Sequence, residues 1–434
     1  MSITQAFTDR CLWLQDQRKN RHLPPVKRWV VALSGGLDSV VTLHLASQLL
    51  PPKSVSAVHV NHQLQSQAND WQTLCEQLCE NYGIPLKSYV ISPQGVSEQL
   101  LRDARYDCFL DFIDEQDCFL FGHHANDQAE TILFRMVRGA GSKGMSGIPA
   151  ERALGKGHLL RPLLALPRHQ LESYARESNL TWVEDPSNQS LDYDRNYLRH
   201  EVVQPLVKHW PKACEKMALS ATLIEQEHQL LNSYLEVDLQ TIAELNCLNL
   251  KAWSEFAENK ANALLRLWIK RETGKIVSAK QFKQIVEQLI YSQQDSNAHS
   301  ILGAYVIRRY RQSLFVLATQ RLSEEWPKMR VGAQDIKLQQ GVLSVKNCHK
   351  GIVLKPEMYW CTAELGLVVK AQNRPAKKVK KLLQEAAVAP WHRDSWPILM
   401  HGEDVVAVVG ICVCEGWLED NQNKSVFCLD WKPL

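Results

Sequence analysis

The chain has 434 residues, with 50 lysines and arginines against 47 aspartates and glutamates, which gives a net charge of +3. At ~150 residues per domain this length predicts two to three domains, and so small a net charge does not by itself indicate a nucleic-acid partner. No apolar run approaches the ~20 residues of a membrane span, and the first twenty residues lack the apolar core of a signal peptide. We therefore expect a cytoplasmic protein.

The twelve cysteines include no CxxC pair. In a chain of this size they are typical of a reducing compartment rather than of a disulfide scaffold. Cys75 and Cys79 share the apolar face of a helical pattern, and Cys412 and Cys414 alternate in a strand-like run, so all four are expected in the core. The sequence predicts neither a zinc site nor an iron–sulfur cluster.

The first half of the chain alternates short apolar runs with helical patterns. We expect strands at 28–34, 55–60, 86–91 and 118–121, and helices at 39–50, 68–82, 97–115 and 125–137. This alternation predicts an α/β fold with a parallel sheet and right-handed crossovers. A ligand should then lie at the carboxyl ends of the strands.

The rest of the chain has a different pattern. Gly139–Pro149 should be a loop, Gln204–Trp210 a linker, Lys216–Tyr291 helical without strands, and Tyr305–Ala318 a hairpin. After Trp326, short strands are expected with one basic helix. We place domain boundaries near 213 and 322. The prediction is a parallel-sheet domain (1–213), a mostly helical domain (214–321) and a small α+β domain (322–434).

The segment Ser34-Gly35-Gly36-Leu37-Asp38-Ser39 lies between an expected strand and an expected helix. Adjacent glycines allow the backbone to approach a phosphate closely, and a helix N-terminus binds anions through its unpaired N–H groups. Asp38 would repel phosphate unless Mg²⁺ lay between them. The alternative is an ordinary capped turn, but the full string favours a phosphate site. It is not a Walker A loop, because it lacks the final GK[ST].

A second group begins at the end of the fourth expected strand, where Gly122-His123-His124 precedes a helix that carries Asp127 and Glu130. Residues three apart on a helix share a face, so these carboxylates are suited to bind Mg²⁺ or a cationic substrate such as a lysine ammonium. The alternative is that they only offset the helix dipole. Two acids directly after a His-His pair favour a functional site.

Residues 34–39 resemble the PP-loop of the N-type ATP pyrophosphatase family, whose members cleave ATP between the α- and β-phosphates and leave an adenylated acceptor. The string HHxxDQxET at 123–131 resembles the signature of the lysidine synthetases within that family. Further similar segments are HVNH at 59–62, the glycine-rich 138–149 (with Met145 where the family has leucine), RPLL at 161–164, DPSN at 185–188 and RNYLR at 195–199. The resemblance covers about residues 28–205.

The resemblance implies specific roles. ATP binding would fall to Ser34, Gly35, Gly36, Leu37, Asp38, Ser39, His59 and Asn61, with Mg²⁺ at Asp38. Lysine and cytidine binding would fall to His123, His124, Asp127, Glu130 and Arg199, and catalysis to Asp38, Arg105, Asp127 and Glu130. Arg105 would stabilise charge on the transferring phosphate through its fork of donors.

A basic segment near the C-terminus suggests a second binding surface. Val379, Leu382, Leu383 and Ala386 fall on one helical face, which leaves the neighbouring lysines outward. Such a face suits backbone phosphates, although a solvated helix face would have the same pattern. The segment also resembles the tRNA-contacting C-terminal domain of lysidine synthetases. The expected tRNA-binding residues are Arg374, Lys377, Lys378, Lys380, Lys381 and Arg393, with Arg308, Arg309 and Arg311 as weaker candidates.

The resemblance implies a two-step reaction. ATP adenylates the C2 oxygen of the wobble cytidine in the CAU-anticodon isoleucine tRNA, and the ε-amine of free lysine then displaces AMP. A splayed, single-stranded base suits this chemistry. The family is also compatible with a homodimer. Two alternatives stay open: another PP-loop enzyme, such as a tRNA thiolase using Cys108 or Cys118 or an amide-forming synthetase with a glutaminase partner, and a non-catalytic RNA-binding protein.

Overall fold

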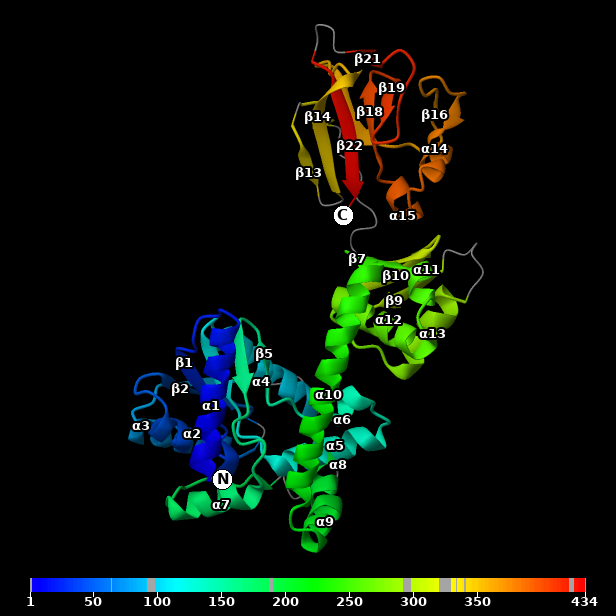
Figure 1. Cartoon of the computed structure of the whole chain (residues 1–434). Coiled ribbons are helices and arrows are strands. Elements are labelled where there is room, and N and C mark those ends of the chain that lie inside the picture. Colours follow the sequence, from blue (N-terminus) through cyan, green and yellow to red (C-terminus); the bar gives the residue numbers. More distant parts are fainter. Residues whose placement is uncertain are drawn as a thin grey trace. The chain divides into compact units, whose positions relative to one another are not determined.

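The computed structural model describes residues 2–63, 65–91, 98–186, 190–191, 193–291, 298–319, 329–332, 334–338, 341–420 and 425–433. The chain divides into two compact units, Met1–Leu231 and Asn232–Leu434. The division falls inside the long helix α10 (Ala213–Ile242). Figure 1 shows the order of the elements along the chain. In the described part, no helix is both long and apolar enough to cross a lipid bilayer.

The first unit is built on a six-stranded sheet with the order β3-β2-β1-β4-β6-β5. All neighbouring strands are parallel except β5, which runs antiparallel to β6. The strands are β1 (Arg28–Ala32), β2 (Val55–Asn61), β3 (Leu86–Val90), β4 (Asp117–Leu120), β5 (Glu151–Leu154) and β6 (Gly157–Leu160), and the helices following the first four are α2 (Leu37–Leu49), α3 (Ala68–Asn81), α4 (Glu98–Phe112) and α5 (Ala125–Val137). The predicted parallel-sheet α/β fold is confirmed.

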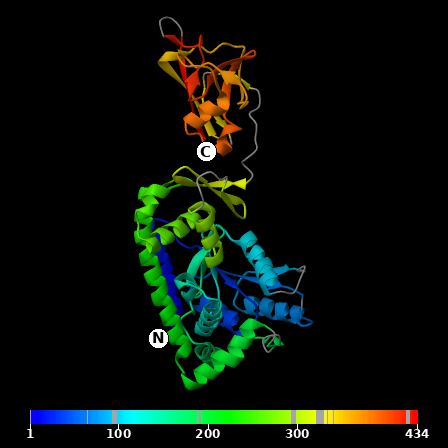
Figure 2. The same ribbon diagram turned by 90° about the vertical axis from the view of Figure 1, so that its right-hand side faces the viewer.

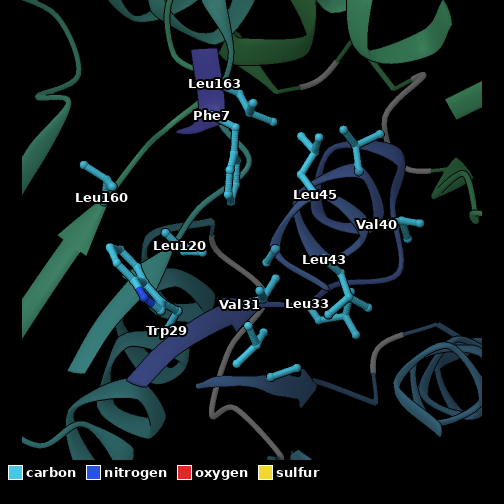
Figure 3. Packing of buried hydrophobic residues seen from close by; sticks show 14 of the residues in the cluster. Phe7, Trp29, Val31, Leu33, Val40, Leu43, Leu45, Leu120, Leu160 and Leu163 are labelled. Carbon is cyan, nitrogen blue, oxygen red and sulfur yellow. The ribbon is translucent and has the colours of Figure 1, made fainter. Parts of the chain in front are cut away.

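Both faces of this sheet are buried. Adjacent residues of a strand point to opposite faces, so neighbours in β1 belong to different cores. Val31 belongs to the core that contains Leu43 of α2, and Val30 belongs to an aromatic cluster around Phe119. Figure 3 shows the first core, with Phe7 near Leu45 and Leu163. Phe7 comes from α1 (Ile3–Asn20), a helix that the sequence analysis did not predict.

Two connections of this unit differ from expectation. The glycine-rich 139–149 contains a short helix, α6 (Ser142–Met145), and α5 holds the segment in place. Arg135 donates to the carbonyls of Gly144 and Gly147 at 3.0 and 2.6 Å, and the Gln128 amide donates to that of Ile148 at 2.9 Å.

The linker prediction for 204–210 is wrong, because α9 (Gln204–His209) lies there and follows α8 (Asp194–Tyr197) and a π-helical turn at Leu198–Val203. Its proline lies in the first turn of α9, which continues directly from the π-helical turn. The segment between α6 and α8 also contains α7 (Arg168–Glu177).

The second unit begins with a helical and antiparallel region. It comprises β7 (Ala243–Glu244), β8 (Cys247–Asn249), α11 (Leu250–Ser254), α12 (Glu258–Thr273), α13 (Ala279–Leu289), β9 (His299–Leu302), β10 (Tyr305–Tyr310) and β11 (Ser313–Ala318). The expected hairpin at 305–318 is confirmed as β10 and β11, which join a sheet with the order β7-β8-β11-β10-β9. The prediction of no strand before 291 is wrong, because β7 and β8 are too short to produce a periodic pattern.

The C-terminal region is rich in antiparallel strands, as predicted for an α+β domain. Its strands are β12 (Met329–Arg330), β13 (Ile336–Leu338), β14 (Gly341–Ile352), β15 (Met358–Thr362), β16 (Val368–Val369), β17 (Lys377–Lys378), β18 (Pro397–His401), β19 (Asp404–Val408), β20 (Cys412–Val413), β21 (Glu419–Asp420) and β22 (Phe427–Pro433). Figure 2 shows them in yellow to red beside the short helices α14 (Val379–Glu385) and α15 (Pro390–Arg393). The boundary predicted near 322 lies outside the described residues.

Candidate active site

The loop between β1 and α2 is held in a fixed shape by its own serines. Ser39 Oγ accepts from the backbone N–H of Ser34 at 3.1 Å and donates to the carbonyl of Gly36 at 2.9 Å. Gly35 has a φ of +86°, and an added Cβ there would approach Cys75 Sγ and Val183 Cγ2 to 3.3 Å. No side chain caps the N-terminus of α2. The N–H of Ser39 bonds to the Gly36 carbonyl at 3.1 Å, which leaves the N–H groups of Leu37 and Asp38 available to an anion.

The loop opens into a cavity of about 790 Å³ at the carboxyl ends of β1, β2 and β4. The cavity brings together most of the predicted site residues: Ser34, Gly36, Leu37, Asp38, Ser39, His59, Asn61, Arg105, His123, Asp127 and Arg199. Gly35, His124 and Glu130 do not line it. His124 and Glu130 are buried and contact residues that do.

His124 links the two carboxylates of the site. Its Nε2 lies 3.5 Å from Asp38 Oδ1, and its Nδ1 lies 3.5 Å from Asp127 Oδ2. His124 is also the N-cap of α5, where its backbone N–H donates to Asp127 Oδ2 at 3.0 Å. Burial opposes protonation, but the carboxylates of Asp127 and Asp38 outweigh it and raise the pKa of His124. The pKa of Asp127 is lowered against burial by His124, His123 and Arg195.

Asp38 lines the cavity, and one of its carboxylate oxygens is buried beside His124. Its Oδ1 is buried and has no hydrogen-bond partner among the described residues, since the 3.5 Å approach of His124 is too poor for a regular bond. A buried unpaired carboxylate oxygen is costly unless a ligand satisfies it. Carboxylate oxygen is a ligand type that Mg²⁺ prefers, so the position fits a magnesium ion between the loop and a phosphate.

Glu130 is held by two arginines of the same chain. Arg195 Nε donates to one oxygen at 2.9 Å, and Arg199 Nε donates to the other at 2.7 Å. Arg195 also donates to Asp127 Oδ1 at 2.8 Å. Every oxygen of Asp127 and Glu130 therefore has a partner. Arg195 lines the cavity too, although the sequence analysis quoted it only inside a motif.

The second-strand residues have partly structural contacts. The ring of His59 bonds through Nδ1 to the carbonyl of Leu33 at 2.9 Å, and burial lowers its pKa. A carbonyl only accepts, so Nδ1 carries the proton and the buried Nε2, which has no described partner, is an acceptor. The Asn61 amide donates to Asn69 and Gln72, both at 3.1 Å, and so fixes the end of β2.

Four thiols of this unit lie in environments that oppose ionisation. Cys75, Cys79, Cys108 and Cys118 are all buried, and burial raises the pKa of each. A reactive cysteine needs the opposite shift. In the part of the chain that the structure describes, no group of three or more His, Cys, Asp or Glu side chains could hold a metal ion.

The basic C-terminal segment is only partly as expected. Val379, Leu382 and Leu383 are buried in the core of their domain, whereas Ala386 is exposed at the C-cap of α14, so its predicted burial is wrong. Arg374, Lys378, Lys380 and Lys381 are exposed.

Four of the other candidate cations bond within the second unit. Lys377, in β17, bonds to Glu385 at 2.8 Å. Arg393 donates to the carbonyl of Val388 at 2.8 Å, and Arg309 donates to that of Ile290 at 2.7 Å. Arg311 donates to the carbonyl of Gln384 at 3.3 Å.

A parallel sheet, a glycine-containing anion loop at its carboxyl edge and an aspartate on the first turn of the following helix are the features of a nucleotide-binding α/β domain, and the particular loop is that of the PP-loop class. In agreement, residues 12–206 match the family model described as PP-loop domain. Residues 248–315 match the TilS substrate binding domain, and residues 363–431 match the TilS substrate C-terminal domain.

Curated relatives align along nearly the whole chain. The tRNA(Ile)-lysidine synthase of Coxiella burnetii is 35% identical and covers 89% of both chains. That of Serratia proteamaculans is 33% identical over 95% of this chain and 97% of its own, and that of Legionella pneumophila (strain Lens) is 30% identical over 92% and 94%. The chain belongs to the tRNA(Ile)-lysidine synthase family.

Proposed function

We propose that this protein is an ATP-dependent ligase that attaches lysine to C2 of the wobble cytidine of the CAU-anticodon isoleucine tRNA. The C2 oxygen attacks the α-phosphate of ATP and pyrophosphate leaves. The ε-amine of lysine then forms the new C–N bond, AMP leaves with the oxygen, and the amine gives up a proton. The single observation that carries the proposal is one cavity lined by both the anion loop and Asp127.

ATP binding falls to the loop residues Ser34, Gly35, Gly36, Leu37, Asp38 and Ser39, with His59 and Asn61 along the second strand. The free N–H groups of α2 and the preformed loop support this assignment. Mg²⁺ would be held at Asp38, where it would neutralise charge on the phosphates. His124 keeps the Asp38 carboxylate next to α5. Arg105 lines the same cavity and supplies donors for phosphate oxygens.

Lysine binding falls to His123, Asp127 and Arg199, which line the cavity, with the buried His124 and Glu130 behind them. Asp127 is the carboxylate of this set that lines the cavity, so it is the acceptor for the ammonium group. Glu130 is 1% exposed and acts through Arg195 and Arg199, whose positions it sets. An ammonium that approaches Asp127 would share its oxygen with Arg195.

The remaining two domains bind the tRNA. We keep boundaries near 213 and 322, and the family matches at 12–206, 248–315 and 363–431 support this division. Arg374, Lys378, Lys380 and Lys381 are exposed and free to meet backbone phosphates, whereas Lys377 and Arg393 would first have to leave their present partners. We expect the reaction in the cytoplasm and predict a homodimer, which light scattering would test.

Among the alternatives raised by the sequence, a tRNA thiolase is not favoured. Its sulfur chemistry would need an accessible low-pKa thiol, whereas Cys108 and Cys118 are buried with raised pKa values. A non-catalytic RNA-binding protein is not favoured either, because the chain retains the anion loop, with Asp38 beside it, and the carboxylate of Asp127 in the same cavity.

The direct experiment is incubation of the full chain with ATP, labelled lysine and bulk tRNA. Label should enter tRNA only with ATP, in step with AMP and pyrophosphate release. Asp38→Ala should abolish pyrophosphate release, while Asp70→Ala, on the first turn of the neighbouring helix α3, serves as a matched acidic control. Sulfur incorporation without lysine, or normal release by Asp38→Ala, would refute the assignment.

A further inference from the structure

Arg161 is a buried arginine whose bonds go to uncharged groups. It is 2% exposed. Its Nη1 donates to the carbonyl of Pro149 at 2.7 Å, and its Nε donates to Nδ1 of His123 at 3.3 Å. No described carboxylate lies within ion-pair distance of it, and burial lowers its pKa to about 10. A guanidinium buried at this cost without a counter-ion needs a reason beyond packing.

The contact with His123 determines where that ring carries its proton. A guanidinium has five N–H donors and no acceptor, so Nδ1 of His123 must offer a lone pair. A neutral imidazole whose Nδ1 is an acceptor has its hydrogen on Nε2. The ring plane is fixed as well, because His123 stacks on Phe121 with centroids 5.6 Å apart and planes 16° from parallel.

The surroundings also keep the ring neutral. The pKa of His123 is lowered to about 3, chiefly by burial; Asp127 opposes this shift, while Arg161, Arg195 and His124 add to it. These groups come from α5, α8 and the segment after β6. At neutral pH the ring therefore cannot act as a general base through Nε2, which already holds a hydrogen.

The position of His123 places this donor near the reacting phosphate. His123 follows β4, the sheet neighbour of β1, and lines the cavity with the anion loop. The preceding Gly122 lies so close to α2 that an added Cβ would come within 2.5 Å of the Asp38 carbonyl oxygen. The ring and the first turn of α2 thus flank the same space.

We propose that Arg161 is a positioning residue that fixes His123 as the neutral Nε2–H tautomer, and that His123 donates this hydrogen bond to an oxygen of the α-phosphate during adenylyl transfer. No proton changes hands. The bond stabilises the charge that builds on the phosphate when the C2 oxygen attacks, and again when AMP leaves. The inference rests on the proposed lysine ligation, whose adenylation step supplies that phosphate.

Three variants of His123 test the donor. Phenylalanine keeps a ring that stacks on Phe121 but has no donor, so His123→Phe should slow pyrophosphate release on the order of 10²-fold, as loss of one preorganised donor does elsewhere. Glutamine places an amide N–H near the Nε2 position, so His123→Gln should lose less than about tenfold. His123→Asn, whose amide mimics Nδ1, should resemble His123→Phe. Equal rates for all three would refute the donor role.

The positioning role of Arg161 has its own signature. In Arg161→Met the pKa of His123 should rise from about 3, because one of the charges that lower it is gone while burial still opposes protonation, so a new ionisation should enter the acid side of the pH–rate profile. It should be absent from the wild type and from the Arg161→Met/His123→Gln double variant. Arg135→Met is the matched control, because Arg135 also holds the 139–149 segment but does not contact His123. A profile that keeps its wild-type shape in Arg161→Met would overturn the proposal.

Nitrogen-15 spectra of histidine-labelled wild-type protein give a readout independent of catalysis and of how well the variants fold. The signal lost in His123→Gln should show an unprotonated Nδ1 and a protonated Nε2 across neutral pH, and a protonated Nδ1 would refute the inference. The wild-type lysine assay distinguishes failure of the proposed lysine ligation from failure of the inference about Arg161 and His123. If it fails, the proposed function fails, whereas normal ligation with the opposite tautomer refutes only the present inference, that is, both the role of Arg161 and the donor role of His123.

Discussion

Glu130→Ala should release the two arginines that close one side of the cavity. Glu130 is 1% exposed and accepts three hydrogen bonds, from Arg195 at 2.9 Å and from Arg199 at 2.7 and 3.2 Å. Arg195 keeps its 2.8 Å contact with Asp127 after the change, but Arg199 keeps only a 3.8 Å approach to that carboxylate. The anchor of Arg199 is therefore the main loss.

The free-energy cost of Glu130→Ala depends on how exposed Arg195 and Arg199 are. Removing one member of a fully buried ion pair costs about 3–5 kcal/mol, because the other charge stays buried and unpaired. Arg195 and Arg199 are 33% and 24% exposed, so each can regain some water. We therefore expect about 2 kcal/mol, which corresponds to roughly 30-fold in a local opening equilibrium.

Hydrogen exchange read by mass spectrometry measures this opening directly. In Glu130→Ala the amides of 194–203 should exchange roughly 30-fold faster, while those of α12 in the second unit stay unchanged. Glu172→Ala is the matched control, because it removes the more exposed Arg168–Glu172 ion pair. In this variant the exchange rates of the 194–203 amides should change less than about threefold. A change below threefold at 194–203 in Glu130→Ala would show that other contacts hold the arginines.

Gly122→Ala should impair adenylation and cost about 1–3 kcal/mol of unfolding free energy. The new methyl group would come within 2.5 Å of the Asp38 carbonyl oxygen and 2.9 Å of Thr42 Oγ1. Gly141→Ala, whose methyl group meets nothing within 4 Å, should behave as wild type in the same denaturation and pyrophosphate assays. Replacing Lys378, Lys380 and Lys381 with alanine should weaken tRNA binding and flatten its salt dependence by about 0.7–0.9 per lost phosphate contact, whereas Lys377→Ala, which removes a cation already paired with Glu385, should change the slope less. Equal slopes would exclude this surface. Burial lowers the pKa of His392 to about 4. Between about pH 6.5 and 4, His392 is therefore protonated in the unfolded chain but neutral in the folded chain. Stability of the C-terminal domain should therefore fall as the pH falls through that range, and His392→Gln should reduce the fall in acid denaturation; an unchanged pH dependence would contradict it.

The elements of the sheet were predictable because their signals are local. Runs of β-branched residues such as Val30-Val31 give the strands, and the helical period of Val40, Leu43 and Ala46 gives α2. Helix α1 had a comparable signal, since Ile3, Phe7, Cys11 and Leu14 repeat at helical spacing and are buried.

The partners of the site's charges were not predictable, because they depend on contacts between distant segments. Spacing correctly placed Asp127 and Glu130 together on α5, whereas the Mg²⁺ ion or cationic substrate expected at these carboxylates stays a prediction. Nothing local to α5 specifies that two arginines 65 and 69 positions later take that place at Glu130. The same holds for Arg161, which reaches His123 across 38 positions. A histidine in a sequence can be a base, a donor or a metal ligand. Arg161, which directly follows β6, can only donate, and its bond to Nδ1 of His123 leaves the role of an Nε2–H donor for that ring. The proposed chemistry of this site therefore depends on arginines that the fold brings next to it from distant segments. Substitutions of Arg161, Arg195 and Arg199 change the environment of the motif residues without removing them, so they test the mechanism more specifically than substitutions of the motif residues themselves.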